Sequence, residues 1–404
     1  MGYKYGHLIP NNIAPKGANK IGIYEKIVDS TNNTTTYVKK FDISLGNLKK
    51  THTSTPNYTI GLISDSHITG TPTNFNGTKK FDNALAYFDN AKCDFCVLSG
   101  DITNIGFYTE VTTNGVKELV YYETQFQAFK DMCDSHDTTV YELAGNHESY
   151  NGQSITINRD AYRSFTHNNI LEATNDENKF HMSYILDENI EEKLGDDVFI
   201  LVGQHHGSWV ASNYDFKWLL DVLEENRNKR CFVFVHSHIS NDSGNATQVR
   251  ANSIFGYWGA YKTNLFMKMM AHYKNAILFH GHSHIKFKYQ ELDENANYTT
   301  INGFKSVHIP SSGAPRDIVS GSVVEDNNAS QFYILDAYDD YIVLNGVNNT
   351  GINNPVANYE ALGTYKIDTT LQYVAENTFE YADEINALPV DGWLIWREKK
   401  HLNF

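Results

Sequence analysis

The chain has 404 residues, of which 41% are hydrophobic and 13% aromatic, and it contains only 8 prolines. This composition supplies enough apolar material for a large core and excludes a disordered or fibrous chain. The formal net charge of −15 disfavours a general nucleic-acid binder, because such proteins depend on Lys and Arg to displace counterions from phosphates.

Targeting signals and cysteines place further limits on the protein. The first residues lack the apolar stretch of a signal peptide, and no segment approaches roughly 18 uninterrupted apolar residues. We therefore expect cytoplasmic synthesis without a signal peptide, and no membrane span. The four cysteines are too few for a disulfide scaffold. Cys93 and Cys96 have CxxC spacing without a second ligand pair nearby, so we interpret them as buried small hydrophobic residues.

Residues 1–56 are rich in Asn, Thr and Lys, and two short runs within them, 20–24 and 37–38, resemble strands. They predict a small β appendage or tether ahead of the core. From residue 58, short apolar runs predict central strands at 59–63, 95–98, 139–143, 198–202, 231–235 and 276–279.

Amphipathic stripes between these runs predict helices. The stripes are Phe81, Ala84, Leu85 and Phe88; Leu119, Tyr122, Phe126, Phe129 and Cys133; Phe216, Leu219, Leu220 and Leu223; and residues 265–273. Strands that alternate with helices imply a layered α/β fold, in which ligands gather beyond the carboxyl ends of the strands.

The last third of the chain returns to strands. Runs at 332–335 and 341–344 flank Asp339-Asp340 and predict a hairpin that closes the sheet. Residues 348–404 mix Asn-rich loops with strand-like runs such as 393–396. We therefore divide the chain into an N-terminal appendage (1–56), a catalytic domain (57–347) and an accessory β-rich tail (348–404).

Residues that can bind metals come directly after five of the predicted strands. They are Asp65 and His67, Asp101, Asn146 and His147, His236, and His282 and His284. Imidazole and carboxylate groups are common ligands of Mn, Fe, Zn and Ni. A single histidine after an apolar strand is more often structural than a ligand, but five such positions together favour one shared metal centre.

These residues form an ordered set of motifs: D-x-H at 65–67, G-D at 100–101, G-N-H-E at 145–148, a lone His236, and G-H-x-H at 281–284. In this order they resemble the signature of the calcineurin-like metallophosphoesterases, over residues 58–344. The family usually has a proline two residues after the fourth-block histidine, where this chain has His238. The resemblance implies a four-layer αββα sandwich, with small β-rich N- and C-terminal appendages, that binds two divalent metal ions (Mn, Fe, Zn or Ni).

The resemblance also implies a role for each motif residue. Asp65, His67 and His284 are expected to hold one metal, Asn146, His236 and His282 the other, with Asp101 bridging both. His147 is expected to act as the catalytic histidine near the leaving-group oxygen, outside both coordination shells. Asp101 or another local carboxylate is the candidate that orients its ring.

Several residues outside the motifs are weaker candidates. Arg316 follows the last metal block and is a candidate to clamp a phosphate, with a surface salt bridge as the alternative. His206, in the pair that follows the strand ending at Val202, is a candidate pocket residue, with packing as the alternative. We interpret His238 as a replacement of the family's proline rather than a ligand. Trp209, Tyr257 and Trp258 are interpreted as core or rim residues.

The expected reaction is hydrolysis of a phosphoester by a metal-bridging hydroxide, because two close cations can lower the pKa of a shared water and stabilise both the attacking and the leaving oxygen. A phosphodiester is slightly favoured over a monoester, because His147 can protonate a poor alkoxide leaving group.

The opening residues 7–24 resemble the tether ahead of phosphoesterase domains in tail-associated proteins of phages of Gram-positive bacteria. This resemblance implies a virion or tail-like particle whose components contact residues 1–56. It also implies a cell-wall glycopolymer such as teichoic acid, a cell-surface phosphopolymer, as substrate. The alternatives are a non-catalytic protein that binds a surface polymer or builds a virion, and a nuclease or nucleotidase, which the negative charge disfavours.

Overall fold

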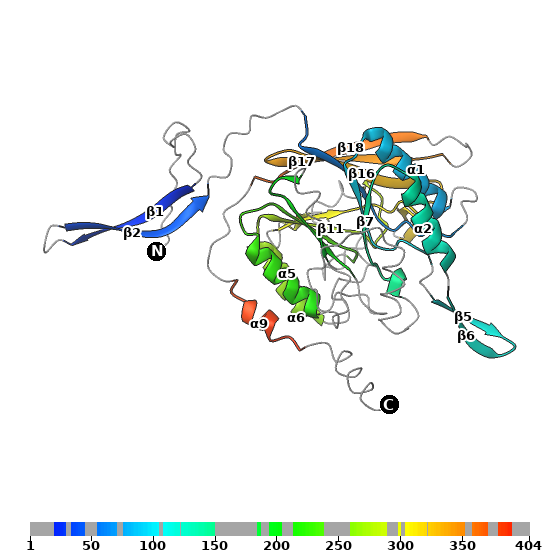
Figure 1. Ribbon diagram of the computed structural model, residues 1–404, viewed down its shortest axis with the longest axis horizontal. Coiled ribbons are helices and arrows are strands. Elements are labelled where there is room, and N and C mark those ends of the chain that lie inside the picture. Colours follow the sequence, from blue (N-terminus) through cyan, green and yellow to red (C-terminus); the bar gives the residue numbers. More distant parts are fainter. Residues whose placement is uncertain are drawn as a thin grey trace. The chain divides into compact units, whose positions relative to one another are not determined.

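The computed structural model describes residues 20–29, 34–44, 55–70, 76–104, 108–121, 123–149, 184–186, 194–203, 213–237, 259–288, 298–299, 304–320, 322–351, 358–370 and 379–389. These residues fall into two compact units, one within residues 1–53 and one from residue 54 onward (Figure 1). Within the described residues, no helix is long and apolar enough to cross a membrane.

The first unit contains an antiparallel pair of strands, β1 (Lys20–Asp29) and β2 (Thr34–Ser44). The register of the pair shifts between Ile23 and Tyr24. Both strand-like runs predicted in this part of the chain are therefore confirmed as strands.

The second unit is built on two six-stranded sheets. The first sheet has the order β18-β17-β16-β3-β4-β7, with β3 (Tyr58–Ile63), β4 (Phe95–Ser99), β7 (Val140–Leu143), β16 (Ser330–Ala337), β17 (Tyr341–Asn349) and β18 (Tyr359–Asp368). Strands β3, β4 and β7 run parallel, and β16 pairs antiparallel with β3. The β16–β17 pair confirms the hairpin predicted around Asp339-Asp340.

The second sheet has the order β12-β13-β11-β10-β9-β8, with β8 (Tyr184–Ile185), β9 (Val198–Val202), β10 (Cys231–Val235), β11 (Ala276–His280), β12 (Tyr298–Thr299) and β13 (Phe304–His308). Strands β9, β10, β11 and β13 run parallel. Both faces of β10 are buried, since Phe232 and Phe234 pack between the sheets while Val233 packs against helices. A continuous apolar run is typical of such a strand.

Helices cover the outer faces of the two sheets (Figure 1). They are α1 (Gly77–Ala91) and α2 (Glu123–Ser135) on the first sheet, and α5 (Asn213–Glu225), α6 (Gly259–His272) and the short α9 (Ala382–Asn386) on the second. Three apolar cores result, one under each pair of long helices and one between the sheets. The layers are therefore helix, sheet, sheet and helix, and the expected αββα fold is confirmed.

The structure differs from the predicted helix at Leu119, whereas Tyr122 lies outside the described residues. Residues Val116–Tyr121 form β6, which pairs with β5 (Tyr108–Thr113), and α2 begins only at Glu123. Asn114 and Gly115 connect the two strands with positive φ angles of 55° and 79°. An Asn-Gly pair favours this tight hairpin turn, so it was the local signal against a helix.

The segment predicted as an accessory tail supplies, where it is described, two elements of the second unit. Strand β18 pairs with β17 at the edge of the first sheet. In α9, Ala382 and Ile385 are buried in the core beneath α5 and α6. The run at 393–396 lies outside the described residues.

The cysteines behave as small hydrophobic residues. All four are free, and Cys96, Cys133 and Cys231 are buried. Burial raises the pKa of the Cys93 thiol to about 12. Cys96 is therefore buried as interpreted, whereas Cys93 is partly exposed and packs against the core beneath α1 and α2.

A clasp of three side chains joins α1 to the segment between α2 and β7. The ring of His136 lies between two carboxylates of α1, with Nδ1 2.6 Å from Asp89 Oδ2 and Nε2 3.1 Å from Asp82 Oδ1. Burial by itself lowers the pKa of His136, but the two carboxylates raise it above its ordinary value of 6.5. Against the effect of burial, hydrogen bonds lower the pKa values of both carboxyls below 3.8.

This clasp predicts a pH-dependent contribution to stability. The contribution of the histidine is full below pH 6.5 and is lost as the pH rises through its raised pKa, whereas that of the carboxylates is lost as the pH falls below 3.8. We expect His136→Gln to lower the Tm by roughly 2 °C near pH 6 and by less near pH 9. Thermal unfolding at both pH values measures the difference, and an equal loss at both would contradict the ionic account.

Candidate metal centre

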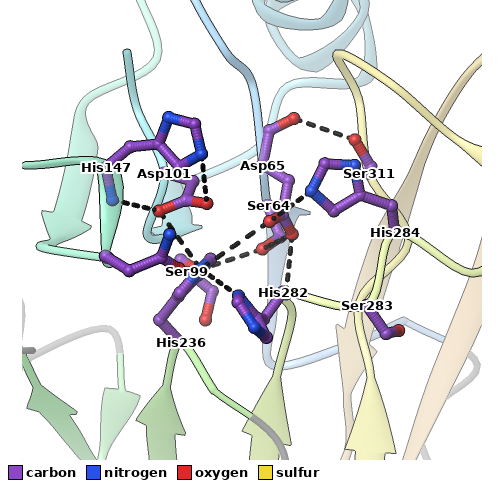
Figure 2. Close-up of polar contacts among 12 residues, drawn as sticks. Ser64, Asp65, Ser99, Asp101, His147, His236, His282, Ser283, His284 and Ser311 are labelled. Atoms are coloured by element: carbon purple, nitrogen blue, oxygen red, sulfur yellow. Dashed lines mark hydrogen bonds and ion pairs between the residues drawn. The ribbon is translucent and has the colours of Figure 1, made fainter. Parts of the chain in front are cut away.

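The predicted ligands meet where strands from both sheets end. Asp65 follows β3, Asp101 follows β4 and Asn146 follows β7 in the first sheet, while His236 follows β10 and His282 and His284 follow β11 in the second. Figure 2 shows Asp65, Asp101 and three of the histidines turned toward one common space. The carboxyl ends of parallel strands meet at one edge of each sheet, so the packing of the two sheets brings distant motifs together.

Two groups of side chains lie close enough to hold an ion each. The first is Asp65, His67, Asp101 and His284, and the second is Asp101, His236 and His282. Within each group the ligand atoms lie within 4.8 Å of one another, and every member is buried. Asp101 belongs to both groups. Its position is therefore the one expected of a shared ligand.

The two oxygens of Asp101 face different partners. Oδ1 accepts a hydrogen bond from the His147 main-chain N–H at 2.9 Å and lies 3.2 Å from His236 Nε2. Oδ2 lies 3.9 Å from His67 Nε2. One oxygen is thus directed to each group of candidate ligands.

Asp65 is held by one oxygen and presents the other to the centre. Its Oδ2 accepts hydrogen bonds from Ser64 Oγ at 2.6 Å and from the His282 main-chain N–H at 2.9 Å. Its Oδ1 lies 3.1 Å from His284 Nε2, yet it is buried without a hydrogen bond to any described residue. A buried carboxylate oxygen left in this way suits a cation.

Main-chain carbonyls fix the histidine tautomers. His236 Nδ1 donates to Ser99 O at 2.8 Å, and His284 Nδ1 donates to Ala314 O at 3.0 Å. These bonds leave the Nε2 lone pairs directed into the centre, an arrangement typical of metal-binding histidines. His236 Nε2 lies 3.1 Å from Asn146 Oδ1. Imidazole nitrogens, carboxylate oxygens and an amide oxygen thus converge on one space, and this donor set fits divalent metal ions.

The electrostatics of the centre also favour positive charge. Burial by itself lowers the pKa of His236, but Asp101 and Asp65 raise it to about 10. Burial and the neighbouring His236 together lower the pKa of His282 to about 3. The two carboxylates thus attract one proton in the metal-free protein, and a divalent cation satisfies them more fully.

The backbone is unusual at the same positions. Five of the candidate ligands have positive φ angles: Asp65 (50°), His67 (47°), Asp101 (50°), His282 (69°) and His284 (61°). Such angles are uncommon for residues other than glycine and persist where the surrounding structure enforces them, as at functional sites. They turn the chain sharply after each strand, so that the side chains share one space.

Two motif glycines are needed for close approach. A Cβ on Gly145 would lie 2.3 Å from Asp101 Oδ1, and a Cβ on Gly100 would lie 2.5 Å from the His236 ring. Gly100 also has a positive φ of 81°. The glycines of G-D and G-N-H therefore make room for neighbouring ligands.

His147 lies beside the centre and outside both groups of ligands. Its Nδ1 donates to Asn104 O at 2.7 Å, and its Nε2 lies 3.7 Å from Asp101 Oδ2. A main-chain carbonyl therefore orients the ring, where a carboxylate was expected. Glu148 instead accepts main-chain hydrogen bonds from Thr103 and Gly145, and burial raises its pKa to about 7.

A cleft of about 490 Å³ opens over the centre. Its walls include the candidate ligands His67, Asp101, Asn146, His282 and His284, together with His147, Lys80, Arg316 and Glu325. The predicted substrate residue Arg316 therefore does lie in the cleft. His206, His238, Trp209, Tyr257 and Trp258 lie outside the described residues, so the roles suggested for them stay predictions.

Lys80 is a cleft residue that sequence reasoning missed. It is on α1 four residues before Ala84, within the apolar stripe, and only 2% of it is exposed. A lysine on the buried face of a helix needs a partner, and Nζ donates to Gly313 O at 2.7 Å. A lysine within the apolar stripe of a helix was therefore the sequence feature that could have identified this residue.

A sequence profile of the family described as calcineurin-like phosphoesterase matches residues 58–286, more than half of the chain. A search of curated proteins found no match. Among solved structures, a dimetal phosphatase from Danio rerio is 12% identical, with a TM-score of 0.51, and the match covers 78% of this chain and 100% of that chain. PhoD is 9% identical, with a TM-score of 0.49, over 86% of this chain and 76% of that chain. The likeness to the Danio rerio structure shows a shared fold.

Proposed function

The chain belongs to the calcineurin-like phosphoesterase family and is a binuclear phosphoester hydrolase that uses two divalent cations. On that premise, we propose which of its residues bind the cations and which residue donates a proton. Asp65, His67 and His284 would hold one cation, Asn146, His236 and His282 would hold the other, and Asp101 would serve both. The observation that carries this assignment is the direction of the two Asp101 oxygens, one toward each group. When bound, the cations supply a water nucleophile of lowered pKa and neutralise charge on the phosphoryl oxygens.

His147 is the proposed proton donor to the leaving group. Because Asn104 O holds Nδ1–H, Nε2 is the nitrogen that can carry and release a proton. The residue lines the cleft, and its main-chain N–H is tied to Asp101. The ring is therefore fixed relative to the shared carboxylate, which keeps the proton donor in register with the centre.

The proposed substrate is a phosphodiester. Its leaving group is a poorly stabilised alkoxide, and a positioned acid such as His147 contributes most when the leaving group needs a proton. Glu148 supports this geometry, since it ties the loop of Thr103 to the loop of Gly145, and these loops carry Asp101 and His147.

Paired chromogenic substrates test this proposal. Protein loaded in turn with Mn, Fe, Zn or Ni should hydrolyse both 4-nitrophenyl phosphate and methyl 4-nitrophenyl phosphate, with the larger kcat/KM for the diester. A larger value for the monoester would reverse the diester proposal. No turnover of either substrate by protein shown to contain metal would count against the enzyme itself.

The surface-polymer substrate and the virion setting stay predictions. They rest on residues 7–24, most of which lie outside the described residues. Release of phosphate-containing fragments from purified cell walls by metal-loaded protein is the result that the polymer hypothesis requires. Binding to the walls without cleavage would favour the non-catalytic alternative.

A further inference from the structure

Two cationic side chains line the cleft without belonging to the metal centre: Lys80 of α1 and Arg316, the first residue of β14 (Arg316–Val319). The main chain of Arg316 is attached directly to a candidate ligand, because its N–H donates to His284 O at 2.7 Å. Its guanidinium makes no hydrogen bond or ion pair with any described residue. The backbone thus fixes the base of a side chain that lines the cleft.

Lys80 is anchored in a similar way. Nζ donates one of its protons to Gly313 O at 2.7 Å, and the Gly313 N–H donates to Asp65 O at 3.0 Å. Burial lowers the pKa of Lys80 to about 8, against the opposing effect of Glu325 and Asp326. The amine is therefore still protonated at neutral pH. A buried ammonium group acts through a lower dielectric than a surface one, so it interacts strongly with an anion in the cleft.

Three described carboxylates, Asp317, Glu325 and Asp326, follow Arg316 in the chain. Asp317 and Asp326 are paired with Lys286, which lies next to the ligand segment. Glu325 lines the cleft opposite Arg316 in the β14–β15 hairpin, where β15 is Ser322–Glu325, but the two side chains form no ion pair. Glu325 is also exposed, so solvent screens its charge more than that of Lys80. Apart from the metal ligands, Glu325 is thus the one carboxylate among the described residues that lines the cleft together with Lys80 and Arg316.

We propose that Lys80 and Arg316 form an anion subsite beside the metal centre, which holds a second phosphoryl or carboxylate group on the substrate arm that stays attached to phosphorus. This inference rests on the proposed function, because the centre must hold the reacting phosphoryl group. The guanidinium of Arg316 can bind either anion in bidentate fashion, and Lys80 contributes a point charge. The preferred substrates are then phosphodiesters with a second anionic group close to the scissile phosphorus.

Non-hydrolysable ligands test the subsite by binding alone. Alkylphosphonates, ω-carboxyalkylphosphonates and alkylene bisphosphonates of short, intermediate and long chain are titrated calorimetrically into metal-loaded protein. At one or more lengths, the ligands with a second anion should bind about tenfold more tightly than the alkylphosphonate, as expected for one charge-assisted contact. Arg316→Gln and Lys80→Met should each bring this ratio close to one, and Glu325→Gln should raise it.

A matched control separates the subsite from general charge. Lys130→Gln removes the same charge from α2, outside the lining of the cleft, and it should leave the ratio unchanged. Metal content and Tm are measured for every variant. If Lys80→Met does not fold, Arg316→Gln decides, since the guanidinium has no described partner to lose.

Each remaining outcome overturns one specific statement. A ratio that stays the same in both Arg316→Gln and Lys80→Met refutes the subsite, because the second anion then binds elsewhere. An equal loss of affinity for all ligands in Arg316→Gln means that this residue clamps the reacting phosphoryl group instead, and it also refutes the subsite. If wild-type protein with two bound metals binds no alkylphosphonate at all, the proposed function itself fails.

Discussion

Asp101→Asn should abolish binding of both metal ions together and lower kcat/KM by about a thousandfold or more, because removal of one metal-binding group costs several kcal/mol of transition-state stabilisation. The substitution keeps the size of the side chain and removes its charge. Only 1% of Asp101 is exposed, and its two oxygens face the two groups of ligands. Metal content after dialysis and turnover of methyl 4-nitrophenyl phosphate measure the two effects.

The matched control for this prediction is Asp131→Asn. Asp131 is on the exposed side of α2, where it accepts a hydrogen bond from Gln127. The substitution should leave both metal content and activity unchanged. Thermal unfolding of both variants reports whether the fold survives. Retention of two metal equivalents by a folded Asp101→Asn variant would refute the shared-ligand assignment.

His147→Asn should lower kcat without removing the metals. A positioned general acid contributes about a hundredfold to ten-thousandfold, and the loss should be large for a substrate with an alkyl leaving group. It should be much smaller for 4-nitrophenolate, which leaves without a proton. Phosphorus NMR follows hydrolysis of the alkyl diester, and absorbance follows the aryl diester.

The ratio of these two losses is the informative quantity. A structural role for His147 would disturb the contact between its loop and the loop of Asn104 and would slow both substrates equally, with loss of metal. An unequal loss with unchanged metal content supports proton donation. Equal losses with unchanged metal content would assign His147 to phosphate binding rather than to the leaving group.

The layered α/β fold was accessible from the sequence because its central strands are buried on both faces, whereas the four-layer αββα arrangement followed from the family resemblance. Runs such as 231–235 show the continuous apolar pattern of parallel strands, and the intervening stripes show the helices. The motif positions followed from the same pattern, since each came directly after a predicted strand. Asp65 and Asp101 could therefore be placed before any distance was known.

Sequence reasoning was wrong where a local signal competed with a longer pattern. Leu119 and Tyr122 continue the apolar spacing of α2, yet the Asn114-Gly115 turn forms a hairpin ahead of that helix. Turn chemistry prevailed because both residues tolerate positive φ and fix the register of the strands beside them.

The sequence by itself determined the chemistry of this protein: the types of ligand, their order along the chain, and the fold that brings strand ends together. Only the tertiary structure decided which atom does what. It directs the two oxygens of Asp101 to different groups of candidate ligands. It also places a main-chain carbonyl where the ring of His147 can donate to it, and it brings Lys80 into the cleft. The physical reason is that periodicity and residue type act locally, whereas these contacts join distant segments whose spacing is set by the packing of sheets and helices.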